Sequence, residues 1–551
     1  MRVQIARKAG FCMGVRRAMR LALKAAETSK APVYTYGPLI HNPQALELLE
    51  KLGIRDLKKM SEVEKGVVII RAHGIPPEEK ESLFKAGFEV VDGTCPRVAK
   101  VQALARKYTQ EGYQVVLIGD KDHAEVKGIL GYTSGKGLVV SNFKDIEALP
   151  PLKKYIILSQ TTQDEEAFDL LSREILSRYP GGKVINTICH ATHVRQESIR
   201  ELARECEAIV VVGGRGSANT NRLAQIAREE NRSTYLVETP EELPLEELSG
   251  FQKVGVSAGA STPNWLINGV VEKLAAAENP LRKLLWFLLN SHIILAGGLS
   301  ALYAGTSLWL QSGPKGSLLW AAFFLAFFAH TWNSLVAVGP LSLCNPYKAR
   351  LFREHERFLL ILSLLSLVGA LICTFRAGPG YLILAAILGG ISAPYSLSPL
   401  RRLFPGNRTI FITLFWTTVA LLFAFNFRVS LPNLLILGLL TFTLSAFRAL
   451  YVDLLDLLED GFLGRESLAA FLGEKKVLWA LLFLVFLGAF SGLGATKLHG
   501  LKALALLLPW LYGILLVFIL RKRPLGRRLL LEYLGEGLSY GYLILTVWAL
   551  K

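Results

Sequence analysis

Three cysteines in the first half of the chain share one setting. Cys12, Cys95 and Cys189 each come just before a stretch with a helical pattern of apolar residues, and they are 83 and 94 residues apart. The start of a helix favours a thiolate, because the helix dipole is positive there. This pattern predicts three related units, each of which contributes one thiolate to a shared centre.

The chemistry of such a centre depends on what the three thiolates bind. Structural Zn²⁺ usually takes local Cys-x-x-Cys pairs, which this sequence lacks. Around a [4Fe–4S] cluster, three cysteines leave one iron without a protein ligand, and that iron can bind a substrate. Three small cysteines of a packed core are the remaining alternative. Cys206, Cys344 and Cys373 receive no role.

Polar side chains near the ends of predicted strands favour an anionic substrate. Three of them are histidines, and Glu125 follows the last histidine after one residue. Two Gly-rich turns, 213–222 and 257–263, offer hydroxyl, amide and backbone N–H groups that can cradle a phosphate. These groups together predict a diphosphate site, with the candidates His41, His73, His123, Ser217, Asn219 and Ser261.

The elements that must position these residues alternate between strands and helices. Apolar runs typical of buried strands cover 67–70, 115–118, 155–158, 209–212 and 254–256, with amphipathic helical stretches between them. This alternation predicts an α/β architecture over residues 1–280. Ligands of open parallel sheets bind beyond the carboxyl ends of the strands, which is where the polar residues fall.

Taken in order, these segments closely resemble the 4-hydroxy-3-methylbut-2-enyl diphosphate reductase (LytB) family. The similarity covers about residues 1–275. Its clearest elements are Gly-Phe-Cys at 10–12, Ala-His-Gly at 72–74, Thr-Cys-Pro at 94–96 and Asn-x-Asn-Arg at 219–222. One departure is Ala218, where the family commonly has a second serine that could contact the diphosphate.

The resemblance implies a trefoil of three α/β units around a [4Fe–4S] cluster held by Cys12, Cys95 and Cys189. The six candidates named above would hold the diphosphate. Glu125 would supply the proton that lets the substrate hydroxyl leave as water, and Thr161 would hold that hydroxyl or an ordered water nearby. The products would be isopentenyl and dimethylallyl diphosphates of the methylerythritol phosphate pathway. An external ferredoxin or flavodoxin would supply two electrons, because the sequence shows no convincing flavin or nicotinamide fingerprint.

Residues 281–551 have a different character. Long charge-free runs, many of them near the roughly 20 residues that span a bilayer, recur along this half. They predict an all-α membrane domain with about nine transmembrane helices, at 284–304, 317–340, 358–375, 380–396, 409–427, 429–447, 477–496, 502–520 and 535–550.

The basic residues of the loops predict the orientation of this domain. The loops after the second, fourth, sixth and eighth helices hold sixteen Lys and Arg, and the other four loops hold five. Positive loops stay in the cytoplasm. The domain would therefore lie in the inner (cytoplasmic) membrane, with residues 1–280 in the cytoplasm and the C-terminus outside. No secretory signal pattern opens the sequence, which agrees with this placement.

An acidic loop after the sixth predicted helix is the candidate site of the membrane half. Asp453, Asp456 and Asp460 fall on one helical face, where either a cation or a basic partner would relieve their repulsion, and clustered oxygens suit Mg²⁺. This segment, Gly-Arg-Glu at 464–466 and Tyr-Ser-Leu-Ser-Pro at 395–399 resemble the UbiA superfamily of prenyltransferases. The superfamily's first acidic motif, Asn-x-x-x-Asp, reads Asn333-Ser-Leu-Val-Ala337 here. The resemblance implies either a Mg²⁺-dependent prenyltransferase or a degenerate anchor or lipid-binding module; a solvated acidic loop is the alternative without it.

The composition limits the alternatives. Of 551 residues, 51% are hydrophobic and 19% charged, so a wholly disordered chain is excluded. The net charge of +17 suggests nucleic acid, but residues 281–551 hold 24 basic and 10 acidic residues, against 38 and 35 in residues 1–280. The excess belongs to the membrane half, which argues against a nucleic-acid partner and an iron–sulfur sensor that binds DNA. Six cysteines do not form a disulfide scaffold.

Overall fold

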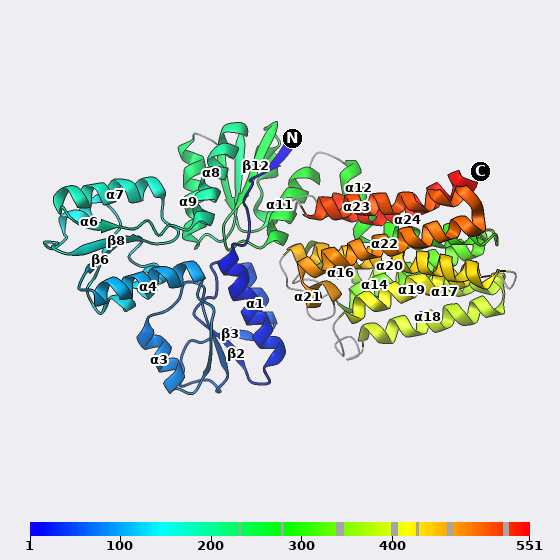
Figure 1. Cartoon of the computed structure of the whole chain (residues 1–551), viewed down its shortest axis with the longest axis horizontal. Helices are drawn as coiled ribbons and strands as arrows, with labels where there is room; N and C mark the ends of the chain where they lie inside the picture. Colours follow the sequence, from blue (N-terminus) through cyan, green and yellow to red (C-terminus); the bar gives the residue numbers. More distant parts are fainter. Residues whose placement is uncertain are drawn as a thin grey trace. The chain divides into compact units, whose positions relative to one another are not determined.

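The computed structural model in Figure 1 divides the chain into two compact units, Met1–Glu278 and Asn279–Lys551. Each unit is described by itself below. The structure describes residues 1–230, 233–276, 280–337, 346–397, 406–425, 429–459, 467–521 and 528–550.

The first unit contains three four-stranded sheets, and every strand pair in them is parallel. The spatial orders are β3-β2-β4-β5, β7-β6-β8-β9 and β11-β10-β12-β1. The prediction of an α/β architecture built from three units is thereby confirmed. The strands are β1 (Arg2–Ile5), β2 (Val33–Tyr36), β3 (Ile54–Asp56), β4 (Val67–Ile70), β5 (Glu89–Asp92), β6 (Gln114–Ile118), β7 (Gly137–Val140), β8 (Tyr155–Ser159), β9 (Lys183–Val184), β10 (Ala208–Val212), β11 (Ser233–Val237) and β12 (Lys253–Ala258).

The three sheets repeat one connection pattern. Each sheet belongs to one α/β unit. The strand that comes first in that α/β unit along the chain takes the second place in the sheet, and the last strand lies at the far edge. The third sheet completes this pattern with β1, so the beginning of the chain supplies the last strand of the last unit. Each predicted cysteine follows such an edge strand: Cys95 follows β5, Cys189 follows β9 and Cys12 follows β1. The repeat therefore gives the three cysteines equivalent places.

Helices cover the sheets and explain their composition. Every residue of β4, β8 and β10 is buried, as expected for parallel strands covered on both faces. The helices are α1 (Met13–Thr28), α2 (Pro43–Lys51), α3 (Pro77–Lys85), α4 (Pro96–Gln110), α5 (Ala124–Leu130), α6 (Phe143–Glu147), α7 (Glu165–Arg178), α8 (His190–Glu205), α9 (Ala218–Glu229), α10 (Leu245–Leu248) and α11 (Asn264–Ala276).

The second unit is helical throughout the part that the structure describes. Its helices are α12 (Pro280–Asn290), α13 (Ile293–Trp309), α14 (Gly316–Val336), α16 (Pro346–Glu354), α17 (Glu356–Ala377), α18 (Pro379–Leu397), α19 (Asn407–Ala424), α20 (Leu431–Glu459), α21 (Leu468–Leu472), α22 (Glu474–His499), α23 (Leu508–Arg521) and α24 (Arg528–Leu550).

Many large apolar side chains of the second unit face outward, among them Trp479 (72% exposed) and Phe486 (75%). Among the described residues, five helices are long and apolar enough to cross a membrane. The count rises to six if α12 and α13, bent by 65°, form one span. Each of the nine predicted segments falls at least partly on a helix, but nine separate spans remain a prediction.

One boundary prediction is wrong. The sequence placed Asp453 and Asp456 in a loop after a helix that ends at 447, whereas α20 continues to Glu459. The physical reason is burial, since Tyr451, Leu454 and Leu455 extend the packed face of the helix. Asp460 lies outside the described residues.

Candidate functional site

Each of the three predicted cysteines is the N-cap residue of a helix: Cys12 of α1, Cys95 of α4 and Cys189 of α8. The predicted placement at helix starts is confirmed. Their backbone N–H groups donate hydrogen bonds to loop carbonyls that follow the third strand of a sheet. The acceptors are Ala260 (3.0 Å), Ala72 (2.9 Å) and Thr161 (2.8 Å), in the order Cys12, Cys95, Cys189.

The three thiols lie near one another. Cys12 and Cys189 both lie close enough to Cys95 to act on its thiol electrostatically. A Cβ atom added at Gly14 would stand 2.6 Å from the Cys95 sulfur, so α1 begins directly against this thiol. Three converging thiols on separate units form a donor set that can hold a metal centre.

At Cys95 the N–H groups at the helix start favour the thiolate, as predicted, but burial outweighs them and the pKa of the thiol is raised. Burial raises the pKa of this thiol, and the N–H groups of Arg97 and Val98 lower it by less. The nearby Cys12 and Cys189 raise it further. A bound metal must therefore replace the proton, as is usual for thiol ligands.

Sequence reasoning missed Arg195, a buried cation beside the thiols. Burial lowers the pKa of this guanidinium, while Cys12 and Cys189 raise it. Arg195 donates a hydrogen bond to the carbonyl of Gly10, in the loop that leads to Cys12. A buried cation is costly unless negative charge accompanies it, and thiolates around a metal supply that charge. The signal in the sequence was an arginine between buried Thr192 and Ile199 on one face of α8.

The predicted histidines also converge. The ring centroids of His41 and His73 are 4.6 Å apart, those of His73 and His123 5.3 Å, and those of His41 and His123 5.8 Å. One ring nitrogen of each lies within 4.8 Å of the others. Burial lowers the pKa of all three histidines, that of His123 to about 4, and the charge of Arg71 lowers each pKa further.

These rings are arranged to meet a ligand. His123 accepts a hydrogen bond at Nδ1 from the N–H of Glu125 (3.2 Å), so the neutral ring carries its hydrogen on Nε2. His41 Nε2 and His73 Nδ1 are buried and have no hydrogen-bond partner within the described structure. Such groups are costly without a ligand. A metal cation and an anion are both possible for three histidines, but the positive charge of Arg71 favours the anion.

The Gly-rich turn of the third α/β unit approaches the histidines. A Cβ atom added at Gly214 would lie 2.9 Å from the carbonyl oxygen of His41, and the hydroxyl of Ser261 donates to the same oxygen (3.0 Å). Ser217 is the N-cap residue of α9, and Asn219 is buried with its Nδ2 unpartnered in the described structure. The turn therefore offers further polar groups toward the same anion.

Glu125 and Thr161 form a buried pair. One carboxyl oxygen of Glu125 accepts from the backbone N–H of Thr161 (2.6 Å) and the other from its hydroxyl (2.9 Å). Burial raises the pKa of Glu125 to about 7, although both hydrogen bonds lower it. A carboxyl group with this pKa can hold a proton near neutral pH and release it. The carbonyl of the same Thr161 accepts from the N–H of Cys189, so this pair adjoins the thiol centre.

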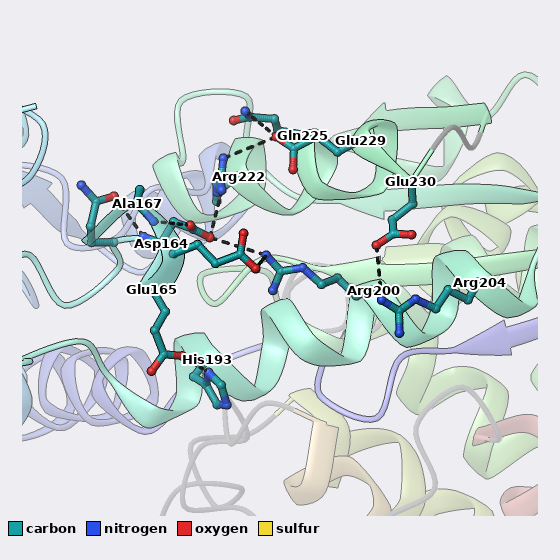
Figure 2. Close-up of polar contacts among 12 residues, drawn as sticks. Asp164, Glu165, Ala167, His193, Arg200, Arg204, Arg222, Gln225, Glu229 and Glu230 are labelled. Atoms are coloured by element: carbon teal, nitrogen blue, oxygen red, sulfur yellow. Dashed lines mark hydrogen bonds and ion pairs between the residues drawn. The ribbon is translucent and has the colours of Figure 1, made fainter. Parts of the chain in front are cut away.

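A network that the sequence did not reveal ties the second α/β unit to the third (Figure 2). The buried Asp164 caps α7 through the N–H of Ala167 (3.0 Å), and it pairs with Arg222 of α9 (2.9 Å) and Arg200 of α8 (3.8 Å). Burial raises the pKa of Asp164, but these hydrogen bonds and charges outweigh burial and hold the pKa below its usual value. The network fixes α9 relative to the loop that carries Thr161.

The acidic residues of the second unit have partners inside the protein. Arg408 lies 3.8 Å from a carboxyl oxygen of Asp453 and 3.5 Å from one of Asp456, and the hydroxyl of Thr409 donates to Asp453. Ala337 is buried at the position where the resemblance requires an aspartate. Among the described residues, this donor set fits Mg²⁺ poorly, because Ala337 offers no ligand and the guanidinium of Arg408 balances part of the charge of both carboxylates.

Fold and site define a three-unit α/β protein in which a thiol centre adjoins a buried carboxyl group and a cluster of neutral histidines beside an arginine. A family model described as LytB protein matches residues 3–275. The 4-hydroxy-3-methylbut-2-enyl diphosphate reductase of Aquifex aeolicus is 47% identical over 273 residues, which cover 49% of this chain and 94% of that protein. The chain therefore belongs to the LytB family.

Two solved structures complete the comparison. A structure of (E)-4-hydroxy-3-methyl-but-2-enyl diphosphate reductase, the terminal enzyme of the non-mevalonate pathway, is 46% identical; the match covers 50% of this chain and 99% of that chain, with a TM-score of 0.41. A UbiA homologue from Archaeoglobus fulgidus, bound to GPP and Mg²⁺, is 15% identical; this match covers 48% of this chain and 99% of that chain, with a TM-score of 0.37.

Proposed function

We propose that residues 3–275 catalyse the reductive removal of the hydroxyl group of 4-hydroxy-3-methylbut-2-enyl diphosphate. The observation that carries this proposal is the Glu125–Thr161 pair, a buried proton source next to three converging thiols. Membership of the LytB family and 47% identity to a reductase of this name support it. The products are isopentenyl and dimethylallyl diphosphates of the isoprenoid pathway.

Cys12, Cys95 and Cys189 would hold a [4Fe–4S] cluster, and the donor set fits because the buried Arg195 requires negative charge beside it. When bound, the cluster supplies electrons and a Lewis-acidic iron for the substrate hydroxyl. The three α/β units each provide one ligand, so the centre can form only when all three units are in place.

The histidine cluster would bind the diphosphate. His123 offers Nε2–H, and the unpartnered nitrogens of His41, His73 and Asn219 offer further donors. Ser217 and Ser261 add hydroxyl groups from the third α/β unit. Each neutral ring has one N–H group to donate to an anion, and the positive charge of Arg71 beside the rings attracts that anion.

Glu125 would deliver the proton that the reaction needs at oxygen. The C–O bond breaks, the oxygen leaves as water, and two electrons and a second proton complete the product. Thr161 fixes both oxygens of Glu125 and thereby aims the carboxyl group. A pKa of about 7 keeps a large share of this group protonated at neutral pH.

The test is anaerobic turnover by the full chain in detergent. The purified protein, reconstituted with iron and sulfide, should show the visible absorption of an iron–sulfur cluster. With reduced methyl viologen it should convert the substrate to both isomeric diphosphates, detected by mass spectrometry. A cluster without turnover would contradict the proposed substrate, and failure to bind iron would contradict the three-cysteine centre.

For the second unit, the observation that Arg408 pairs with Asp453 and Asp456 favours an anchor over a Mg²⁺-dependent prenyltransferase. We propose that this unit lies in the inner membrane with about nine spans and holds the reductase at the cytoplasmic face. Mg²⁺ should leave its melting temperature unchanged, and geranylgeranyl diphosphate should not be consumed. Mg²⁺-dependent consumption that Asp453→Asn abolishes would contradict the anchor role. Cysteine labelling from either side of the membrane tests the orientation.

A further inference from the structure

Arg195 is the one buried cation among the described residues of the first unit, with an exposed fraction of 5%. It forms no ion pair with a carboxylate in that part of the chain, whereas Arg200 and Arg204 of the same helix pair with Asp164 and Glu230. A buried charge without a counter-charge is strongly destabilising. The fold therefore keeps this guanidinium for a negative group that the carboxylates of the first unit do not supply.

The hydrogen bonds of Arg195 join the backbone segments that carry two of the thiols. One terminal nitrogen, Nη2, donates to the carbonyl oxygen of Gly10, two residues before Cys12. The other, Nη1, donates to the carbonyl oxygen of Ala191 (3.2 Å), two residues after Cys189. Gly10 is itself closely held, because a Cβ atom added there would stand 2.2 Å from a side-chain oxygen of α11. The guanidinium therefore fixes its own position relative to both thiols.

A third N–H group of this guanidinium lacks an acceptor. The Nε atom of Arg195 is buried and has no hydrogen-bond partner within the described structure. The thiols of Cys12 and Cys189 lie close enough to favour the charged form of the guanidinium. The reduction potential of an iron–sulfur cluster depends on the charges and the hydrogen-bond donors around its sulfur atoms. Arg195 supplies a fixed positive charge and a free donor at this place.

We propose that Arg195 is a positioning residue that raises the reduction potential of a cluster held by Cys12, Cys95 and Cys189. This inference rests on the proposed function, because it requires that cluster. Reduction adds one electron from an external reductant, so the reduced cluster carries one more negative charge than the oxidised cluster. A fixed positive charge nearby stabilises the reduced form more than the oxidised form. An arginine that only held the backbone would leave the potential unchanged.

The experiment measures the midpoint potential of the cluster in the full chain in detergent. Arg195→Gln removes the charge and keeps a polar side chain, whereas Arg195→Lys keeps the charge and loses the planar fork of donors. Arg204→Gln is the matched control, because Arg204 lies on the same helix but is exposed and pairs with Glu230 at 3.8 Å (Figure 2). Each protein is reconstituted anaerobically with iron and sulfide and titrated with dithionite in the presence of redox mediators. Visible absorption and electron paramagnetic resonance give the reduced fraction, so neither substrate nor turnover enters the measurement.

We expect Arg195→Gln to lower the ratio of reduced to oxidised cluster about tenfold at a given potential. For one electron, this change equals a fall of about 59 mV in the midpoint potential. Arg195→Lys should keep most of the potential but release iron to a chelator several-fold faster, because an ammonium does not reproduce the two-carbonyl contact. Arg204→Gln should match the unaltered chain in both measurements. Equal midpoint potentials in Arg195→Gln and the unaltered chain would overturn the proposal.

A variant that fails to assemble the cluster still leaves a decisive comparison. If Arg195→Gln binds no iron, a potential of Arg195→Lys near that of the unaltered chain supports the role of the charge. A clearly lower potential of Arg195→Lys, or no cluster in either variant, would overturn that role. Absence of a cluster from the unaltered chain would instead overturn the proposed function, because Arg195 would then have no centre to act on.

Discussion

The two units of this protein hold their candidate site residues in opposite states. In the first unit, His41 and His73 present buried nitrogens with no partner in the described structure, and Arg195 is a buried cation beside thiols. In the second unit, Asp453 and Asp456 already share Arg408. Polar groups buried without partners are stable only when a ligand satisfies them. The difference teaches that a motif indicates a site only when the fold leaves its groups available.

Loss of a thiol should have the largest effect. Cys189→Ser removes one of three converging ligands, so the protein should lose its visible cluster absorption, most of its iron and all measurable turnover. Cys206→Ser is the matched control, because Cys206 is buried at the end of α8 and away from the proposed centre in sequence and role. Full cluster content in the Cys189 variant would contradict the proposal that the three thiols of the first unit hold the cluster.

Removal of one histidine should weaken substrate binding. His41→Ala deletes a donor toward the proposed diphosphate, and a hydrogen bond to a charged group contributes about 1.5–3 kcal/mol, or roughly 10- to 100-fold in KM. Turnover at saturation should change less. The exposed His193, which pairs with Glu165 at 2.5 Å, offers the control His193→Ala. An unchanged KM in the His41 variant would contradict binding of the diphosphate by the histidine cluster.

Activity should depend on the protonated form of Glu125. Burial raises the pKa of this group to about 7, so the protonated donor is present below that pH and is lost as the pH rises through it. The value of kcat/KM should therefore fall about tenfold per pH unit above 7. The three histidines are already neutral there, because burial lowers their pKa values. A pH profile flat from 6 to 9 would contradict the role of Glu125.

Loss of the ion pair that joins the second and third α/β units should have the smallest effect on chemistry. Arg222→Gln leaves Asp164 without its 2.9 Å partner, which should lower the stability of the first unit by about 3 kcal/mol and kcat/KM several-fold. Arg222→Lys should restore part of both. Urea unfolding and steady-state kinetics measure the two effects. Because Asp164 touches neither thiols nor histidines in any described contact, cluster content should stay unchanged.

The sequence predicted the repeating elements well, for physical reasons. The runs at 67–70 and 155–158 are apolar throughout, as buried parallel strands must be, and the structure confirms both. Cysteines before helical patterns indicated N-cap positions, which the structure also confirms. The pairing of β1 with β12 at the edge of the third sheet could not be predicted from the sequence, because strand pairing between residues 2–5 and 253–256 leaves no local pattern.

Contacts between distant residues were the part that sequence reasoning missed. Arg195, Arg71 and the pairing of Asp164 with Arg222 depend on how the three units meet, and nothing near these residues in the chain indicates their partners. The same holds for Arg408 in the second unit. There the motif called for a cation or a basic partner among the carboxylates, and the fold supplied Arg408 from another helix, which the sequence did not indicate.

The most direct test of the comparison is one anaerobic assay on two variants of the full chain. Glu125→Gln keeps the size and shape of the side chain, with one oxygen left to accept a hydrogen bond from Thr161. Asp453→Asn/Asp456→Asn neutralises the acidic pair of the second unit. Conversion of 4-hydroxy-3-methylbut-2-enyl diphosphate with reduced methyl viologen should fall at least about 100-fold in the first variant with its cluster intact, and stay at the level of the unaltered chain in the second. Full conversion by the Glu125 variant, or its loss in the aspartate variant, would contradict the account.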